Sequence, residues 1–114
     1  MTSNLQRLKR NKHILHVLKD AKPKLRQAIL SNVYNDVIKT INEIAYNTLH
    51  KNNPISEKVK LSLKKYKKSL RCLSCQKRSL ASKKKILLQN GSGFLPILIG
   101  TVLSGIIGNI LNKE

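Results

Sequence analysis

Residues 58–93 carry twelve lysine and arginine side chains and no aspartate or glutamate. A stretch of this kind cannot pair its charges internally, so most of these side chains must face solvent or an external anion. The rest of the chain is unevenly charged too. Residues 1–26 hold eight basic and one acidic side chain, and residues 27–57 hold two basic and three acidic side chains. Residues 94–111 hold no charged side chain. The net charge of +18 over 114 residues therefore lies mostly in two basic segments that flank a near-neutral one and precede an apolar one.

This composition argues against an enzyme. Five acidic side chains in the whole chain leave few candidates for general acid/base catalysis. An aromatic content of 4%, with no tryptophan, predicts a small core. The excess of positive charge instead indicates a polyanionic partner, nucleic acid or an anionic membrane, and no cofactor is expected. Two cysteines and the lack of a signal-peptide pattern at the N-terminus predict synthesis in a reducing, intracellular compartment.

The spacing of apolar residues predicts helices along the chain and no strands. Apolar side chains recur every three or four positions in residues 5–18, 25–49 and 59–73. Pro23 suits the first turn of a helix, because its missing N–H has no partner there in any case. Residues 25–49 form one long helix or two that are broken near Ser31 and Asn32. Ser56 is the expected N-cap of the helix that follows.

We therefore expect an all-α fold, a small helical module of three to four helices followed by a separate apolar C-terminal helix. The expected organisation is a basic N-terminal helix at residues 1–22, a helical module with a lysine-rich face at 23–90, a Gly/Ser hinge at 91–93 and an apolar membrane-active tail at 94–112.

The lysine-rich face is the first candidate binding site. Like charges three or four residues apart repel on a helix, and bound phosphates would relieve that repulsion. Lysines outnumber arginines, which favours contacts to phosphates over the reading of base edges. The alternatives are anionic lipid and a merely solvated face. The candidate nucleic-acid or lipid contacts are Lys58, Lys60, Lys64, Lys65, Lys67, Lys68, Arg71, Lys77, Arg78, Lys83, Lys84 and Lys85.

Cys72 and Cys75 form a Cys-x-x-Cys pair that suggests zinc or redox chemistry. His13 and His16 lie three residues apart and could in principle complete a Cys₂His₂ set. Their order and separation match no zinc-finger spacing, and no strand precedes the cysteines as in redox enzymes. We therefore predict no metal site and interpret the two cysteines as small side chains near a helix end.

The uncharged segment 94–111 is the second candidate site. A helix of 18 residues is about 27 Å long, slightly short of a bilayer's hydrocarbon core. The expected membrane contacts are Phe94, Leu95, Ile97, Leu98, Ile99, Val102, Leu103, Ile106, Ile107, Ile110 and Leu111. Gly100, Ser104 and Gly108 form a helix-packing ridge of small residues at four-residue spacing. The alternative is a buried helix that closes the core of a small bundle.

The order of these segments resembles a known family. A basic stretch, a Gly-Ser break and an apolar end resemble the adenovirus core protein X (mu) precursor over the last third of the chain. The similarity to the X-like proteins of adintoviruses and Polinton/Maverick elements extends over residues 20–110, and its most specific part is Lys83–Pro96. The chain differs from the adenovirus protein in being rich in lysine and not in arginine. The resemblance implies a virion-associated protein of a double-stranded DNA virus or its endogenous derivative, located in the virion interior or host nucleus, or on a membrane after release.

The sequence thus predicts a non-enzymatic protein that binds the DNA backbone through its lysine-rich helices and a membrane through its tail. Double-stranded DNA and an anionic membrane are the expected partners, together with capsid proteins and self-association through the tail. One alternative is a membrane-inserted or tail-anchored protein whose basic face contacts only lipid. Another is a helical interaction protein whose tail closes its own bundle.

Overall fold

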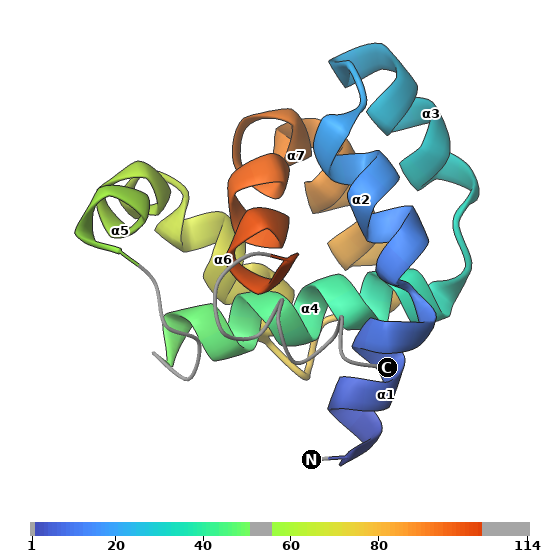
Figure 1. Cartoon of the computed structure of the whole chain (residues 1–114), viewed down its shortest axis with the longest axis horizontal. Helices are drawn as coiled ribbons and strands as arrows, with labels where there is room; N and C mark the ends of the chain where they lie inside the picture. Colours follow the sequence, from blue (N-terminus) through green and yellow to red (C-terminus); the bar gives the residue numbers. More distant parts are fainter. Residues whose placement is uncertain (1, 51–55, 104–114) are drawn as a thin grey trace.

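The protein is all-helical over the residues that the computed structural model describes, 2–50 and 56–103. Seven helices follow one another in that part of the chain, which contains no strand (Figure 1). They are α1 (Thr2–Arg10), α2 (Lys12–Asp20), α3 (Pro23–Asn32), α4 (Asn35–Leu49), α5 (Glu57–Lys64), α6 (Lys67–Ser74) and α7 (Leu80–Leu103).

Several predicted helix boundaries are confirmed. Pro23 begins α3, and the Ser56 hydroxyl accepts a hydrogen bond from the Val59 backbone N–H at 3.2 Å as the N-cap of α5. Residues 25–49 form two helices, with the break at Val33 and Tyr34, slightly later than expected, where both residues adopt extended backbone angles.

The seam predicted for residues 59–73 is also confirmed, but it belongs to two helices. The core includes Leu63, Leu70 and Leu73, and Tyr66 packs against it. The first helix ends at Lys64 and the second begins at Lys67, so the apolar seam is divided between α5 and α6.

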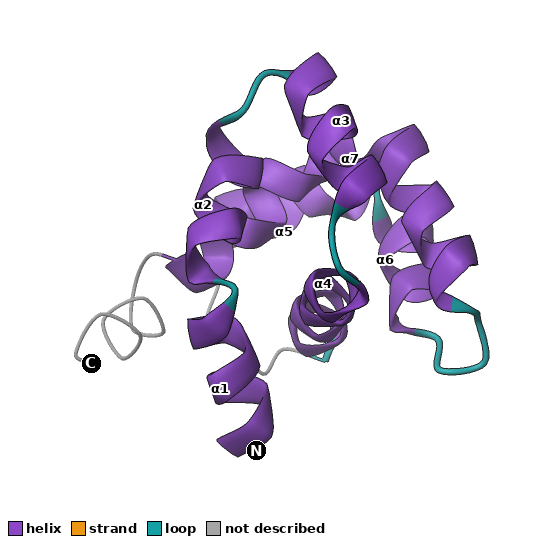
Figure 2. Cartoon of the chain, turned by 90° about the vertical axis from the view of Figure 1, so that its right-hand side faces the viewer, coloured by secondary structure: helices purple, strands orange, loops and turns teal. Residues whose placement is uncertain are grey.

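Helix α4 lies in the middle of the molecule. Figure 2 looks nearly along its axis, with α1 on one side and α6 on the other. Its stripes of apolar residues face several neighbours at once, so Ile38, Ile41, Ile44 and Ala45 are all fully buried. Helix α7 packs on α4 and also contacts α2, α3, α5 and α6, which makes it the second central element.

The separate C-terminal helix expected from residue 94 is not confirmed. Residues 94–103 continue α7 after a bend of 106° between Leu80–Asn90 and Gly93–Leu103, and this second half enters the core. Its fully buried side chains are Phe94, Leu95, Leu98, Ile99 and Val102. The apolar surface that predicts a membrane segment is here covered by α2, α4 and their neighbours.

The bend coincides with the predicted Gly/Ser hinge. A Cβ on Gly93 would overlap the Tyr66 hydroxyl and lie 2.8 Å from Tyr66 Cζ, so only glycine allows this approach. Pro96 lies inside α7, three residues after Gly93, the first residue of the second half. Its backbone nitrogen carries no hydrogen, so it donates no helical hydrogen bond.

Candidate nucleic-acid interface

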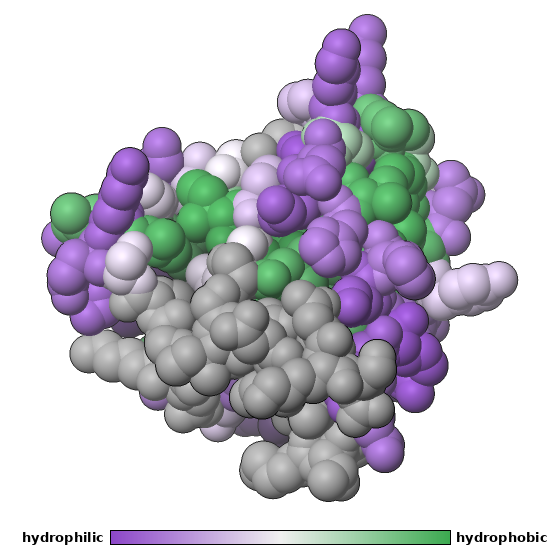
Figure 3. Space-filling model, viewed as in Figure 1, coloured by the Kyte–Doolittle hydropathy of each residue, from purple (hydrophilic) through white to green (hydrophobic). Residues whose placement is uncertain are grey.

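The basic residues of α5, α6 and the turn after α6 are exposed. Helices α5 and α6 follow one another in the chain, separated by Lys65 and Tyr66, and both pack against α7. We call this region the basic surface, and it consists of the exposed side chains Lys58, Lys60, Lys64, Lys65, Lys67, Lys68, Arg71, Lys77, Arg78 and Lys85. Hydrophilic side chains are visible over α5 at the left of Figure 3.

Two of the twelve predicted contact residues are differently placed. Lys83 is only 7% exposed, and its alkyl stem packs within the helical module. Lys84 Nζ donates a hydrogen bond to the Ser31 carbonyl at 2.7 Å, in the last turn of α3. A cation is favourable at this end of a helix, so Lys84 ties α7 to α3.

Few anionic groups neutralise the basic surface. Glu57 lies 3.6 Å from Lys60 Nζ across one turn of α5, and no other acid occurs between residues 57 and 103. Lys65 Nζ also lies 5.2 Å from the centre of the Tyr66 ring, a cation–π contact. Most of the charge in this region is therefore left for solvent or an external anion.

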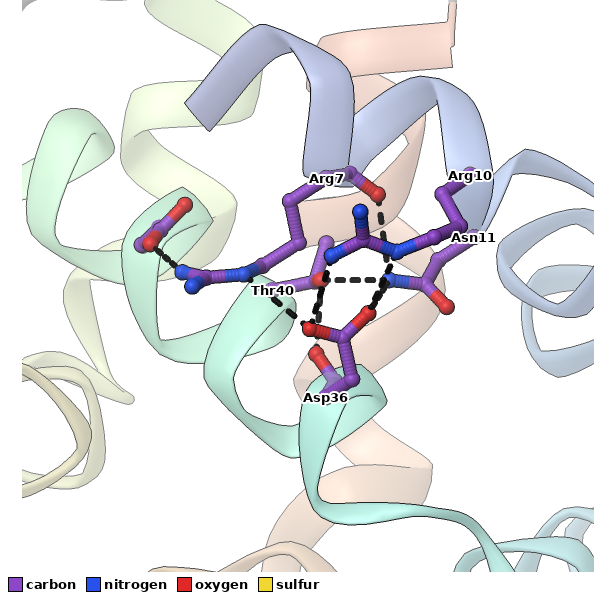
Figure 4. Close-up of polar contacts among 6 residues, drawn as sticks. Arg7, Arg10, Asn11, Asp36 and Thr40 are labelled. Atoms are coloured by element: carbon purple, nitrogen blue, oxygen red, sulfur yellow. Dashed lines mark hydrogen bonds and ion pairs between the residues drawn. The ribbon is translucent and has the colours of Figure 1, made fainter. Parts of the chain in front are cut away.

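The remaining acids of the described chain are held elsewhere. Asp20 lies 3.5 Å from Lys19, and Asp36 and Glu43 lie on α4 against α1. Arg10 contacts both carboxylate oxygens of Asp36, through Nε at 3.1 Å and Nη2 at 3.0 Å (Figure 4).

A polar network surrounds Asp36 and fastens α1 to α4. Arg7 Nε donates to Asp36 at 3.2 Å and also pairs with Glu43, while Asn11 Nδ2 donates to Asp36 at 2.9 Å and to Thr40 Oγ1 at 2.8 Å (Figure 4). The hydrogen bonds from Arg10 and then Asn11 lower the pKa of Asp36 to about 2. Burial raises the pKa of Glu43, more than the charge of Arg7 lowers it. This network holds the fold together and brings no free carboxylate toward the basic surface.

Arg26 has a structural role that the sequence did not reveal. Its side chain is buried and donates hydrogen bonds to the carbonyls of Leu18 at 2.6 Å, Lys19 at 3.3 Å and Ala21 at 2.5 Å. These carbonyls lie at the C-terminal end of α2, where no backbone N–H reaches them all. In the sequence, Arg26 cannot be distinguished from the exposed basic residues around it. The structure of the turn between α2 and α3 shows that it caps the end of α2.

Cys72 is half-buried, Cys75 is exposed, and both are free thiols at the end of α6. Within the described ranges, no group of three or more histidine, cysteine or acidic side chains is placed to hold a metal ion.

The predicted membrane residues divide into two sets. Ile97 and Leu103 are half-buried against the core, beside the five fully buried side chains of the same half-helix. A Cβ on Gly100 would meet no described atom within 4 Å. Six expected residues lie outside the described part of the chain: Ser104, Ile106, Ile107, Gly108, Ile110 and Leu111.

No described helix is by itself long and apolar enough to cross a bilayer. The two halves of α7 satisfy that requirement only when taken together, by length and composition.

The chain matches no family model, no curated protein and no solved structure.

Proposed function

We propose that this protein binds the sugar–phosphate backbone of double-stranded DNA through the basic surface. The observation that carries the proposal is the set of ten exposed lysine and arginine side chains on adjoining helices with one acid, Glu57, at their edge. Flexible lysines suit contacts to phosphates of any sequence.

The character of the basic surface favours phosphate over lipid. Helices α5 and α6 expose one large apolar side chain, Leu61, and bury or half-bury the rest against the core. A bilayer surface gains binding energy from apolar side chains that enter it, whereas a phosphodiester backbone needs only charge. The resemblance to viral X-like core proteins supports duplex DNA as the polyanion, and the protein would there offset the charge of a packaged genome.

Salt and sequence dependence of duplex binding test this proposal. A protein that makes six to ten phosphate contacts loses about 10³–10⁵ in affinity between 50 and 200 mM salt, because condensed counter-ions are no longer released as favourably. We expect a loss of this size in fluorescence anisotropy with labelled duplexes, and equal affinity for A·T-rich and G·C-rich sequences. Binding that persists in 0.5 M NaCl, or a strong preference for one sequence, would contradict it.

A membrane role for the second half of α7 is a second candidate, favoured by the apolar character of the bent pair Leu80–Asn90 and Gly93–Leu103. This role requires the half-helix to leave the core, since Phe94, Leu95 and Leu98 are fully buried. Leakage of anionic vesicles by the full chain, but not by a variant with Leu98→Asp, would support insertion of this segment. Equal leakage by both would exclude it as the active element.

A further inference from the structure

Helices α2 and α3 expose apolar side chains that the core does not use. Val17 is 45% exposed, Leu25 is 55% exposed and Tyr34, in the connection to α4, is 85% exposed. Figure 3 shows a hydrophobic patch over α2 and α3 at the right of the molecule. A continuous apolar patch on a small protein usually marks a site of interaction.

A groove adjoins these protruding side chains. It has a volume of about 480 Å³, and its apolar lining comes from Ile14 on α2, Ile29 on α3, Val33 in the connection and Val37 at the start of α4. We call this groove together with Val17, Leu25 and Tyr34 the α2–α3 face.

Helix α2 has two apolar sides. Leu15 and Leu18 point into the core and are fully buried, whereas Val17 lies on the outer side and Ile14 lines the groove. Ile14 is partly buried and also packs against the core, so packing within the chain accounts for it in part. Val17 is exposed and available to a partner outside the chain.

Positive charge borders the α2–α3 face where α3 begins. The exposed Lys22 and Lys24 lie at the turn into α3 and in its first turn, next to Leu25 in sequence. Arg10 also lines the groove, but its charge is paired with Asp36. One acid lies close to these lysines in sequence, Asp20, beside Lys19.

We propose that the α2–α3 face docks on the surface of a bilayer that contains anionic lipid. An apolar face with a border of exposed lysines matches the layered chemistry of that surface, where acyl chains lie beneath phosphate groups. Leu25 and Tyr34 stand out from the protein, and tyrosine places its ring and hydroxyl at the boundary between the two layers.

Two other occupants fit less well. A second copy of this chain would bring the same cations against one another across the face. A helix of an acidic protein would fill the groove beside Tyr34 but would leave Leu25 and Val17, which do not line it, uncovered. A bilayer surface can contact the protruding side chains and the groove at the same time.

Docking through this face is independent of DNA binding. Helix α5 and helix α3 lie at opposite sides of Figure 1, with α7 between them. Docking also leaves the second half of α7 in the core, unlike membrane insertion of that segment. A protein with both activities would hold a polyanion against a membrane.

A pair of matched double variants tests the proposal in the full-length chain. Leu25→Ser with Tyr34→Ser removes the two protruding side chains, and Leu61→Ser with Tyr46→Ser makes the same chemical change on α5 and α4, where both residues are also exposed. In flotation with phosphatidylcholine vesicles containing phosphatidylserine, we expect the first variant to bind at least tenfold more weakly, since two large apolar side chains no longer enter the bilayer. The second variant should change less than twofold, and equal losses in both would overturn the proposal.

A fluorescence reporter gives a second, direct measurement. The chain contains no tryptophan, so Leu25→Trp and Leu61→Trp each introduce a single probe. On addition of the same vesicles, we expect a blue shift from Leu25→Trp and none from Leu61→Trp. An unshifted Leu25→Trp spectrum under conditions where the protein floats with vesicles would show that the α2–α3 face stays in water, and it would refute the inference.

Discussion

Leu98→Ala tests whether the second half of α7 is part of the core. Leu98 is fully buried in the half-helix that the sequence predicts to be separate. Truncating a buried leucine removes transfer free energy and leaves a cavity, at a cost of about 2.7–5 kcal/mol in a well-packed protein. We expect a loss of about 3 kcal/mol in the free energy of unfolding, a large part of the total of about 5–15 kcal/mol for a domain of this size.

Urea unfolding followed by far-UV circular dichroism measures this loss. With a denaturant dependence of about 1.5–2 kcal/mol per molar, 3 kcal/mol lowers the urea midpoint by about 1.5–2 M. Leu61→Ala is the matched control, since Leu61 is 68% exposed and the same truncation there should cost less than about 0.5 kcal/mol. If Leu98→Ala lowers the midpoint no more than Leu61→Ala does, residues 93–103 do not stabilise the module and the helix is separate after all.

Three further perturbations test single contacts. Gly93→Ala places a Cβ against the Tyr66 ring and should destabilise by about 1–3 kcal/mol in urea unfolding, an added cost that disappears in a Tyr66→Ala background. Asp36→Asn should lower the urea midpoint at pH 6. The difference in midpoint from the natural protein should close as the pH falls from about 4 to about 2, because a carboxylate whose pKa is lowered by folding stabilises the fold only while it is ionised. A difference that is unchanged at pH 2 would contradict this reasoning. Arg26→Leu leaves three carbonyls at the end of α2 without their donor and should cost about 1–3 kcal/mol, whereas an unchanged midpoint would mean that water satisfies them.

Local chemistry made much of the fold predictable from the sequence. Helix starts at Pro23 and after Ser56 follow from backbone geometry and capping, which depend on a few adjacent residues. The seam through Leu63 and Leu70 follows from spacing, and it is buried as predicted. Spacing did not reveal the break after Lys64, because the same residues stay on the core side of both helices.

The fate of the apolar segment could not be predicted from its own residues. An uncharged helix has the same composition whether lipid or protein surrounds it, and the difference lies in what α2 and α4 present to it. Leu15 and Leu18 belong to the same core cluster as this half-helix, together with five buried apolar residues of α4. The close approach of Tyr66 to Gly93 occurs next to the 106° bend in α7, and the spacing of apolar residues does not predict it either.

The candidate sites were predictable to different degrees. Exposure of the lysines on α5 and α6 follows from charge density alone, whereas the burial of Lys83 and the capping role of Lys84 depend on where α3 ends. The α2–α3 face gave no signal, because its residues are apolar at helical spacing like those of the core. Spacing places Leu18 on the same side of α2 as Leu15 and leaves Val17 off that side, but it does not show that Val17 stays exposed.

We propose that the basic surface, and not the net charge as a whole, contacts DNA phosphates. Two triple variants that each remove three positive charges test it directly: Lys64, Lys67 and Lys68 to glutamine on the basic surface, and Lys22, Lys24 and Lys39 to glutamine at exposed positions elsewhere. The measurement is the slope of the logarithm of the duplex association constant against the logarithm of salt concentration. We expect the first variant to reduce the steepness of that slope by about 2.7, since each lost phosphate contact contributes about 0.9, and the second variant to leave it nearly unchanged. Equal slopes for the two variants would contradict the assignment of DNA binding to this surface.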